Sequence, residues 1–114
     1  MIRFYHNPRC SKSREALKLL QERSAPLEIV EYLKTPPSIE ELQQLCQALG
    51  VSPRQMMRSK EDDYVRRHLD DVSLEDKHLL QAIHTHPQLL ERPIALLGDR
   101  AVIGRPPEQV LSLL

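Results

Sequence analysis

The order of strand-like and helix-like segments constrains the fold of this chain more than any other feature. Residues 1–5 (MIRFY) and 25–33 (APLEIVEYL) are rich in strand-forming residues, so each predicts a short strand. Between them, apolar residues recur at helical spacing and predict a helix from Ser11 or Ser13 to about Arg23. The first part of the chain therefore has the order β-α-β.

The last part of the chain has the order β-β-α. Residues 93–104 (PIALLGDRAVIG) predict two strands around a Gly98-Asp99-Arg100 turn. Residues 105–114 predict a final helix with Pro106 or Pro107 near its first turn. We expect three of its apolar side chains to point inward: Val110, Leu111 and Leu114.

Between these two parts, the clearest helix signal begins at Ser38. Ser38 and Glu41 match a capping box, and Gly50 stands where a helix C-cap belongs. The apolar residues of this segment recur on one face: Ile39, Leu42, Leu45 and Leu49. The pattern therefore predicts an amphipathic helix from Ser38 to Gly50.

The rest of the middle region predicts shorter helices. Residues 51–72 are polar and predict two short helices with a break near Ser59-Lys60. Ser73 with Asp76 predicts the start of a further helix, which Pro87 ends.

Together these segments predict an α/β fold with a thioredoxin-like mixed sheet, in the order β-α-β … β-β-α. Residues 1–114 would form a single domain, because the length suits one domain. The thioredoxin-like core would comprise about 1–35 and 92–114, and the inserted helical region about 38–90. A fold of this kind says nothing yet about function.

Composition excludes several classes of protein. The 16 basic and 16 acidic residues give a net charge of zero, which argues against a nucleic-acid binder. No apolar run approaches the ~18 residues of a membrane span, and the first residues lack a signal-peptide pattern, so we expect a cytoplasmic protein with no membrane partner.

No feature favours a dimer, so a monomer is expected. The two cysteines predict neither a structural disulfide nor a metal site.

Cys10 stands at the junction between a loop and the first helix. The free N–H groups at a helix start carry partial positive charge and stabilise a thiolate, so the pKa of Cys10 should lie below that of a free cysteine. Arg9, Lys12 and Arg14 add positive charge nearby. The same N–H groups bind oxyanions. Cys10 is therefore a candidate nucleophile beside a candidate anion site.

Three neighbours have alternative interpretations. Ser11 and Ser13 have hydroxyls that can donate to the thiolate or to an anion, or merely cap the helix. His6 can act as a hydrogen-bond partner or general base for the thiol, or have no role.

The spacing also shows what is missing. A dithiol oxidoreductase has C-x-x-C, and position 13 here is Ser13, so Cys10 cannot form a disulfide within its own motif. Cys46 falls beside the apolar stripe of its helix and is expected to be a small buried hydrophobe. An oxidised Cys10 would need an external thiol, such as glutathione or a glutaredoxin.

Five short motifs, in order along essentially the whole chain, resemble the glutaredoxin-dependent arsenate reductase family. They are YHNPRCSKSR, EYLKTPPS, LGVSPRQMMR, HPQLLERPI and VIGRPPE. The resemblance implies a thioredoxin-like fold with an inserted helical region, and no bound cofactor. It implies that glutathione is the co-substrate and that a glutaredoxin is a partner.

The resemblance also implies roles for individual residues. Cys10 matches the nucleophile, and His6 matches a histidine that helps it ionise. Arg14 is a further candidate for binding the oxyanion. Three distant arginines match the residues that bind arsenate or a related oxyanion: Arg58, Arg92 and Arg105. Pro93 matches a proline that is commonly cis.

Two other functions remain open from the sequence. This chain has Ser11-Lys12 where well-characterised members have Gly-Thr, so a thiol oxidoreductase or deglutathionylating protein without arsenate activity is one alternative. A redox-responsive regulator of the Spx type is the other, although such regulators sense oxidation through C-x-x-C.

Overall fold

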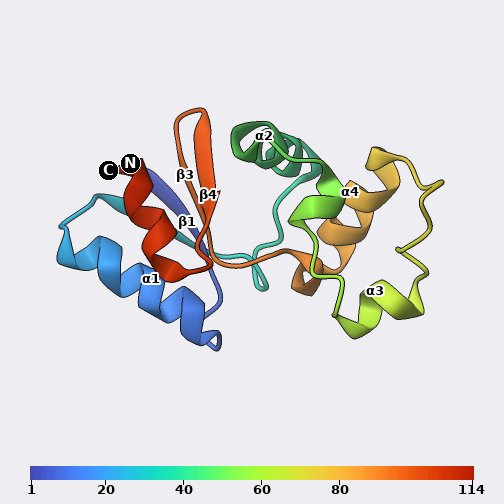
Figure 1. Ribbon diagram of the computed structural model, residues 1–114, viewed down its shortest axis with the longest axis horizontal. Helices are drawn as coiled ribbons and strands as arrows, with labels where there is room; N and C mark the ends of the chain where they lie inside the picture. The colour runs from blue at the N-terminus through green and yellow to red at the C-terminus, as the bar shows by residue number, and fades with distance from the viewer. The chain divides into compact units, whose positions relative to one another are not determined.

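The computed structural model describes all residues 1–114, and the chain divides into two compact units. The first unit combines residues 1–35 with 92–114, and the second comprises residues 36–91. Figure 1 shows the first unit in blue to cyan and in orange to red, from the two ends of the sequence, and the second in the colours between them.

The first unit contains a four-stranded sheet in the order β2-β1-β3-β4. The strands are β1 (Ile2–His6), β2 (Leu27–Glu31), β3 (Ile94–Leu97) and β4 (Arg100–Ile103). β1 pairs with β2 in parallel, whereas the β1–β3 and β3–β4 pairs are antiparallel. The predicted thioredoxin-like mixed sheet is thereby confirmed.

Helix α1 (Ser11–Glu22) connects the two parallel strands, close to the predicted bounds. Its buried face, Ala16 and Leu20, shares one apolar cluster with Phe4 of β1 and Ala95 of β3. Helical connections are the usual way to join parallel strands, because the chain must return to the end of the sheet where the first strand began. The strand, the helix and the next strand therefore form a β-α-β unit, of which Figure 1 labels β1 and α1.

The final helical segment differs from the prediction. It is a 3-10 helix, η3 (Pro107–Leu113), and its buried residues are Pro107, Val110 and Leu113. These recur at intervals of three because a 3-10 helix has three residues per turn. Leu114, which was expected to point inward, is 56% exposed. The prediction was wrong there because it assumed an α-helical repeat.

The predicted hairpin is confirmed, with a shorter turn. Residues 98 and 99 form the turn, and Arg100 already belongs to β4. Gly98 has a φ of 63°, in the left-handed region that glycine enters without steric cost.

The second unit is helical. Helix α2 (Ile39–Leu49) has the predicted capping box between Ser38 and Glu41, and Gly50 closes it in the left-handed conformation with a φ of 71°. The two predicted short helices follow as η1 (Pro53–Met56) and α3 (Asp62–Arg66). The structure confirms these predictions, and the sequence could make them because their signals lie within a few neighbouring residues.

Helix α4 (Asp76–Thr85) begins later than predicted. Its N-cap is Glu75, in a capping box with His78, and not Ser73. The hydroxyl of Ser73 instead donates to Asp71 Oδ1 at 2.7 Å, and its N–H donates to the same oxygen at 2.9 Å. This local turn competes with the helix for Ser73, which explains the wrong prediction. The segment η2 (Pro87–Leu89) follows α4.

None of the helices combines the length and the apolar composition that crossing a membrane requires.

Candidate active site

Cys10 occupies the N-cap of α1, at the end of a tight turn. Its N–H donates to Asn7 O at 3.0 Å, and its carbonyl accepts the N–H of Arg14 at 3.0 Å as the first bond of the helix. Pro8 stands inside this turn, where it cannot continue the β1 ladder. The half-buried thiol therefore lies beside the N–H groups at the start of α1.

These surroundings lower the pKa of the Cys10 thiol. Burial acts in the opposite direction and is the largest single effect, because it disfavours the charged thiolate. The backbone N–H groups of Ser13 and Lys12, together with the positive charge of the Arg92 guanidinium and a hydrogen bond from it to the thiolate, outweigh this effect, so the net pKa lies below the ordinary value. Cys10 is therefore more nucleophilic at neutral pH than an ordinary cysteine.

Arg92 is the residue whose environment most strongly suggests a ligand. Its Nε and Nη1 atoms are buried, and neither has a hydrogen-bond partner. Buried guanidinium groups are normally paired, because an unpaired buried charge is costly. Arg92 lies directly before Pro93, through the cis peptide bond that was predicted, and its charge acts on Cys10. An anion at this place would satisfy both free donors.

Arg105 lies next to Arg92 in the same unit. Its Nη1 donates to Arg92 O at 3.4 Å, and its guanidinium is otherwise exposed. The backbone of the preceding residue holds the two segments together, because Gly104 N–H donates to Pro93 O at 2.8 Å. A Cβ at Gly104 would lie 2.7 Å from Pro93 Cγ, so only glycine allows this close approach.

His6 and Ser13 form a buried pair, which the loop before Cys10 joins. His6 Nδ1 lies 2.7 Å from Ser13 Oγ, and the N–H of Asn7 donates to the same oxygen at 3.0 Å. Ser13 is completely buried, and the His6 ring packs against Phe4 with 5.6 Å between ring centroids. The Ser13 hydroxyl is thus occupied by the residues that shape the loop before Cys10.

Burial lowers the pKa of His6, although the carboxylate of Glu31 opposes this effect, and the charge of Arg14 adds to it. His6 is therefore neutral at neutral pH. A neutral imidazole can accept a proton, which a general base must do.

The other two candidates near Cys10 lie on the surface. Ser11 is exposed at the first position of α1. Arg14 Nη1 donates to Pro8 O at 2.9 Å, so this guanidinium supports the turn that carries Cys10.

Arg58 belongs to the second unit, where two carboxylates surround it. Its Nη1 lies 3.0 Å from Glu61 Oε2, and its Nε lies 3.9 Å from Glu91 Oε1. Its backbone N–H donates to Leu89 O at 2.7 Å. Unlike that of Arg92, the guanidinium of Arg58 has carboxylate partners within its own unit.

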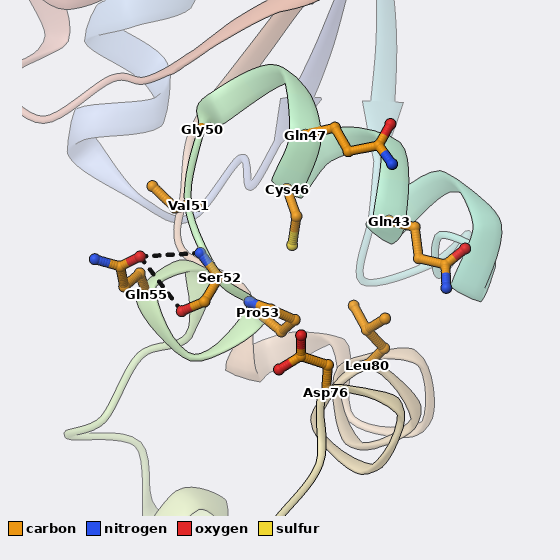
Figure 2. Close-up of a pocket in the computed structure, with 10 residues that line it drawn as sticks. All are labelled: Gln43, Cys46, Gln47, Gly50, Val51, Ser52, Pro53, Gln55, Asp76 and Leu80. Carbon is orange, nitrogen blue, oxygen red and sulfur yellow. Dashed lines mark hydrogen bonds between the residues drawn. The ribbon is translucent and has the colours of Figure 1, made fainter.

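Cys46 is buried, as predicted, in the second unit. Its Sγ lies 3.9 Å from Met56 Sδ, and burial, with the nearby charge of Asp76, raises the pKa of this thiol to about 11. It lines a cavity of about 550 Å³ between α2, η1 and α4, shown in Figure 2. None of the candidate residues described above lines this cavity. A thiol with so high a pKa is a poor nucleophile at neutral pH.

No sequence pattern indicated that Asn7 would bond to Ser13 or that two nitrogens of Arg92 would lack partners. The first depends on how the loop after β1 folds against the start of α1, and the second on residues brought together by the sheet. No group of three or more His, Cys, Asp or Glu side chains gathers anywhere in the structure in a way that could hold a metal ion.

Known proteins resemble this chain along its full length. The model of the ArsC family matches residues 5–113. An arsenate reductase from Neisseria meningitidis serogroup B is 50% identical over 114 residues, which cover 99% of this chain and 97% of that protein. An arsenate reductase from Escherichia coli K12 is 36% identical over 115 residues, covering 99% of this chain and 80% of that protein. The solved structure of an arsenate reductase from Vibrio cholerae is 48% identical, with a TM-score of 0.96, and the match covers 99% of this chain and 97% of that one.

Proposed function

The chain belongs to the ArsC family, and on that premise we propose that it is an arsenate reductase whose nucleophile is Cys10. Glutathione is the proposed co-substrate, and a glutaredoxin completes the cycle. The observation that carries the proposal is the pair of buried, unpartnered nitrogens of Arg92, whose charge also lowers the pKa of Cys10.

Arsenate binding follows from the charges at the site. Arsenate is a tetrahedral oxyanion, and a guanidinium can hold two of its oxygens at once. Arg92 has free donors for it, Arg105 lies alongside, and the N–H groups at the start of α1 favour negative charge. Arg58 is proposed as a third oxyanion-binding arginine on its place in the family motif alone.

The proposed reaction has three steps. The Cys10 thiolate attacks arsenic, forming an S–As bond while an oxygen of arsenate leaves as water. Glutathione then attacks the sulfur of Cys10, and the electron pair of the S–As bond stays with arsenic, which leaves as arsenite. The resulting disulfide between Cys10 and glutathione is reduced by a glutaredoxin thiol. His6, neutral and close to the loop, is proposed to accept the proton of Cys10.

The test is arsenate reduction in the presence of glutathione and glutaredoxin. We expect turnover by the native protein, none by Cys10→Ser, and native turnover by Cys46→Ser, because Cys46 is buried with a raised pKa. Absence of turnover by the native protein would refute arsenate as the substrate. If that protein instead released glutathione from a glutathionylated protein, it would be a thiol oxidoreductase that uses the same cysteine.

A further inference from the structure

A second cavity, of about 390 Å³, lies in the first unit where the parallel strands β1 and β2 end. His6 and Glu31 are the last residues of these strands, they pair in register, and both line the cavity. In α/β sheets, ligands bind in the crevice beyond the carboxyl ends of parallel strands. The volume falls in the range of about 300–1,000 Å³ that is typical of small-molecule sites.

One wall of this cavity is the turn that carries Cys10. Asn7, Pro8 and Arg9 line the cavity, and the turn closes with the bond from Cys10 N–H to Asn7 O at 3.0 Å. Arg9 directly precedes Cys10 in the chain, so the lining of the cavity ends one residue before the nucleophile. The cavity therefore lies close enough to Cys10 to hold a second reactant.

The charges around the cavity have a definite pattern. Arg9 and Lys34 are positive, and Glu31 is negative. The Arg9 side chain has no partner in the structure, since its only hydrogen bond is from its backbone N–H to Asn7 Oδ1 at 3.0 Å. Lys34 Nζ lies 3.5 Å from Glu31 Oε1, but the Lys34 side chain is 79% exposed, so this pair is weak. Two cations and one anion are thus available to a ligand.

We propose that this cavity binds the reducing thiol, as a small peptide that carries two carboxylates and one ammonium group, which is the chemistry of glutathione. The two carboxylates pair with Arg9 and Lys34, and the ammonium pairs with Glu31. Pro8 and Leu33 offer apolar contact to the peptide backbone. The inference rests on the proposed function, because it assigns a place to the co-substrate of that reaction.

Bound there, the thiol loses its proton to solvent, and its sulfur attacks the sulfur of Cys10. An S–S bond forms, the S–As bond breaks, and its electron pair reduces arsenic. Two separate sites, with arsenate at Arg92 and the thiol beside Arg9, allow both reactants to be present at once. Binding both reactants at defined places removes much of the entropic barrier to a two-molecule reaction.

The test reverses one charge at the cavity. Lys34→Glu changes an exposed residue at the cavity, and Lys18→Glu makes the same change on an exposed position of α1 outside it. Calorimetry measures the binding of S-methylglutathione, which cannot react, and steady-state kinetics measure the KM values for glutathione and arsenate. We expect Lys34→Glu to weaken S-methylglutathione binding and raise the glutathione KM by about tenfold, with the arsenate KM unchanged. Lys18→Glu should change each value less than twofold.

The binding and kinetic results separate this inference from the proposed function. Binding of S-methylglutathione that Lys34→Glu weakens and Lys18→Glu does not would support the cavity, even if arsenate were not reduced. If the native protein turned over arsenate but both variants bound S-methylglutathione equally, the proposed glutathione site would be refuted and the proposed function would stand. No binding of S-methylglutathione to the native protein would also overturn it. Circular dichroism confirms that both variants fold.

Discussion

Replacing Arg92 with methionine should make the protein more stable and less able to bind an anion. Methionine replaces the aliphatic part of the arginine side chain, fills irregular space well, and carries no hydrogen-bond donor. The substitution therefore removes the two buried nitrogens that have no partner in the structure. A residue retained at the expense of stability is expected where function requires it.

The magnitude follows from the two unpartnered atoms. A buried donor without a partner costs about 1–3 kcal/mol, and Arg92 as a whole is only half-buried, so we take the lower end for the pair. The free energy of unfolding should rise by about 1–2 kcal/mol in Arg92→Met. For a chain of this size, the Tm should rise by about 4 °C per kcal/mol.

Adding arsenate should reverse the order of stability of the native protein and Arg92→Met. A ligand present at about 100 times its Kd stabilises the native protein by about 2.7 kcal/mol, whereas a variant that does not bind it gains nothing. Urea unfolding, followed by circular dichroism in a buffer without phosphate or sulfate, measures both cases. We expect Arg92→Met to be the more stable protein without arsenate and the less stable one with it.

The matched control is Arg100→Met, on the exposed end of the hairpin. Arg100 Nη2 donates to Leu113 O at 3.3 Å, so the control loses one weak bond and should keep the full stabilisation by arsenate. The reasoning is refuted if Arg92→Met loses stability in the absence of arsenate, or if arsenate stabilises it as much as the native protein.

The same substitution should change the reactivity of Cys10. Loss of the Arg92 charge raises the pKa of the thiol, so the midpoint of its alkylation by iodoacetamide moves to higher pH. In the native protein the folded pKa is lowered, so the thiolate contributes to stability above the pKa of the unfolded cysteine. That contribution is lost as the pH falls through the folded pKa. An alkylation midpoint that is the same in both proteins would contradict the assigned effect of Arg92.

Three further predictions concern residues around the site. Ser13→Ala leaves two partners of its hydroxyl unsatisfied, the buried His6 and the partly buried N–H of Asn7, so urea unfolding should show a loss of about 2–4 kcal/mol. The exposed Ser11→Ala should stay within about 0.5 kcal/mol of the native value, and equal stabilities of the two variants would contradict the prediction. Gly104→Ala places a Cβ 2.7 Å from Pro93 Cγ, so urea unfolding should show that the free energy of unfolding falls by about 1–3 kcal/mol. A native value would mean that the proline segment shifts at no cost. Cys46 has a pKa of about 11, so at pH 8 mass spectrometry should find a single alkylated cysteine in the folded protein and two in urea; double labelling without urea would show that Cys46 is accessible.

The sequence predicted the features that depend on neighbouring residues. The capping box of α2 needs only Ser38 and Glu41, and the left-handed C-cap needs only Gly50. The position of Cys10 at a helix start was predictable for the same reason, because a strand, a proline and a helix follow one another within a few residues.

Features that depend on competition or on distant contacts were not predictable. The sequence around Ser73 suits a helix N-cap, but the Ser73 hydroxyl donates to Asp71 Oδ1 and does not cap the helix. Whether the last segment would form an α-helix or a 3-10 helix depended on packing in the core, which buries Leu113 and exposes Leu114. The lack of partners at Arg92 likewise follows from the sheet that places it near Cys10, and no local pattern reports that.

The position of β1 in the sheet also affects how the protein folds during translation. β1 is an inner strand, bonded on one side to β2 and on the other to β3, which is encoded near the opposite end of the printed sequence. During translation, β1 can pair with β2 early, but one of its edges stays open until residues 94–97 leave the ribosome. Pairing between such distant residues is slow, and an open strand edge can bind other chains. The nascent chain should therefore be most prone to aggregate while the helical residues 36–91 are being synthesised.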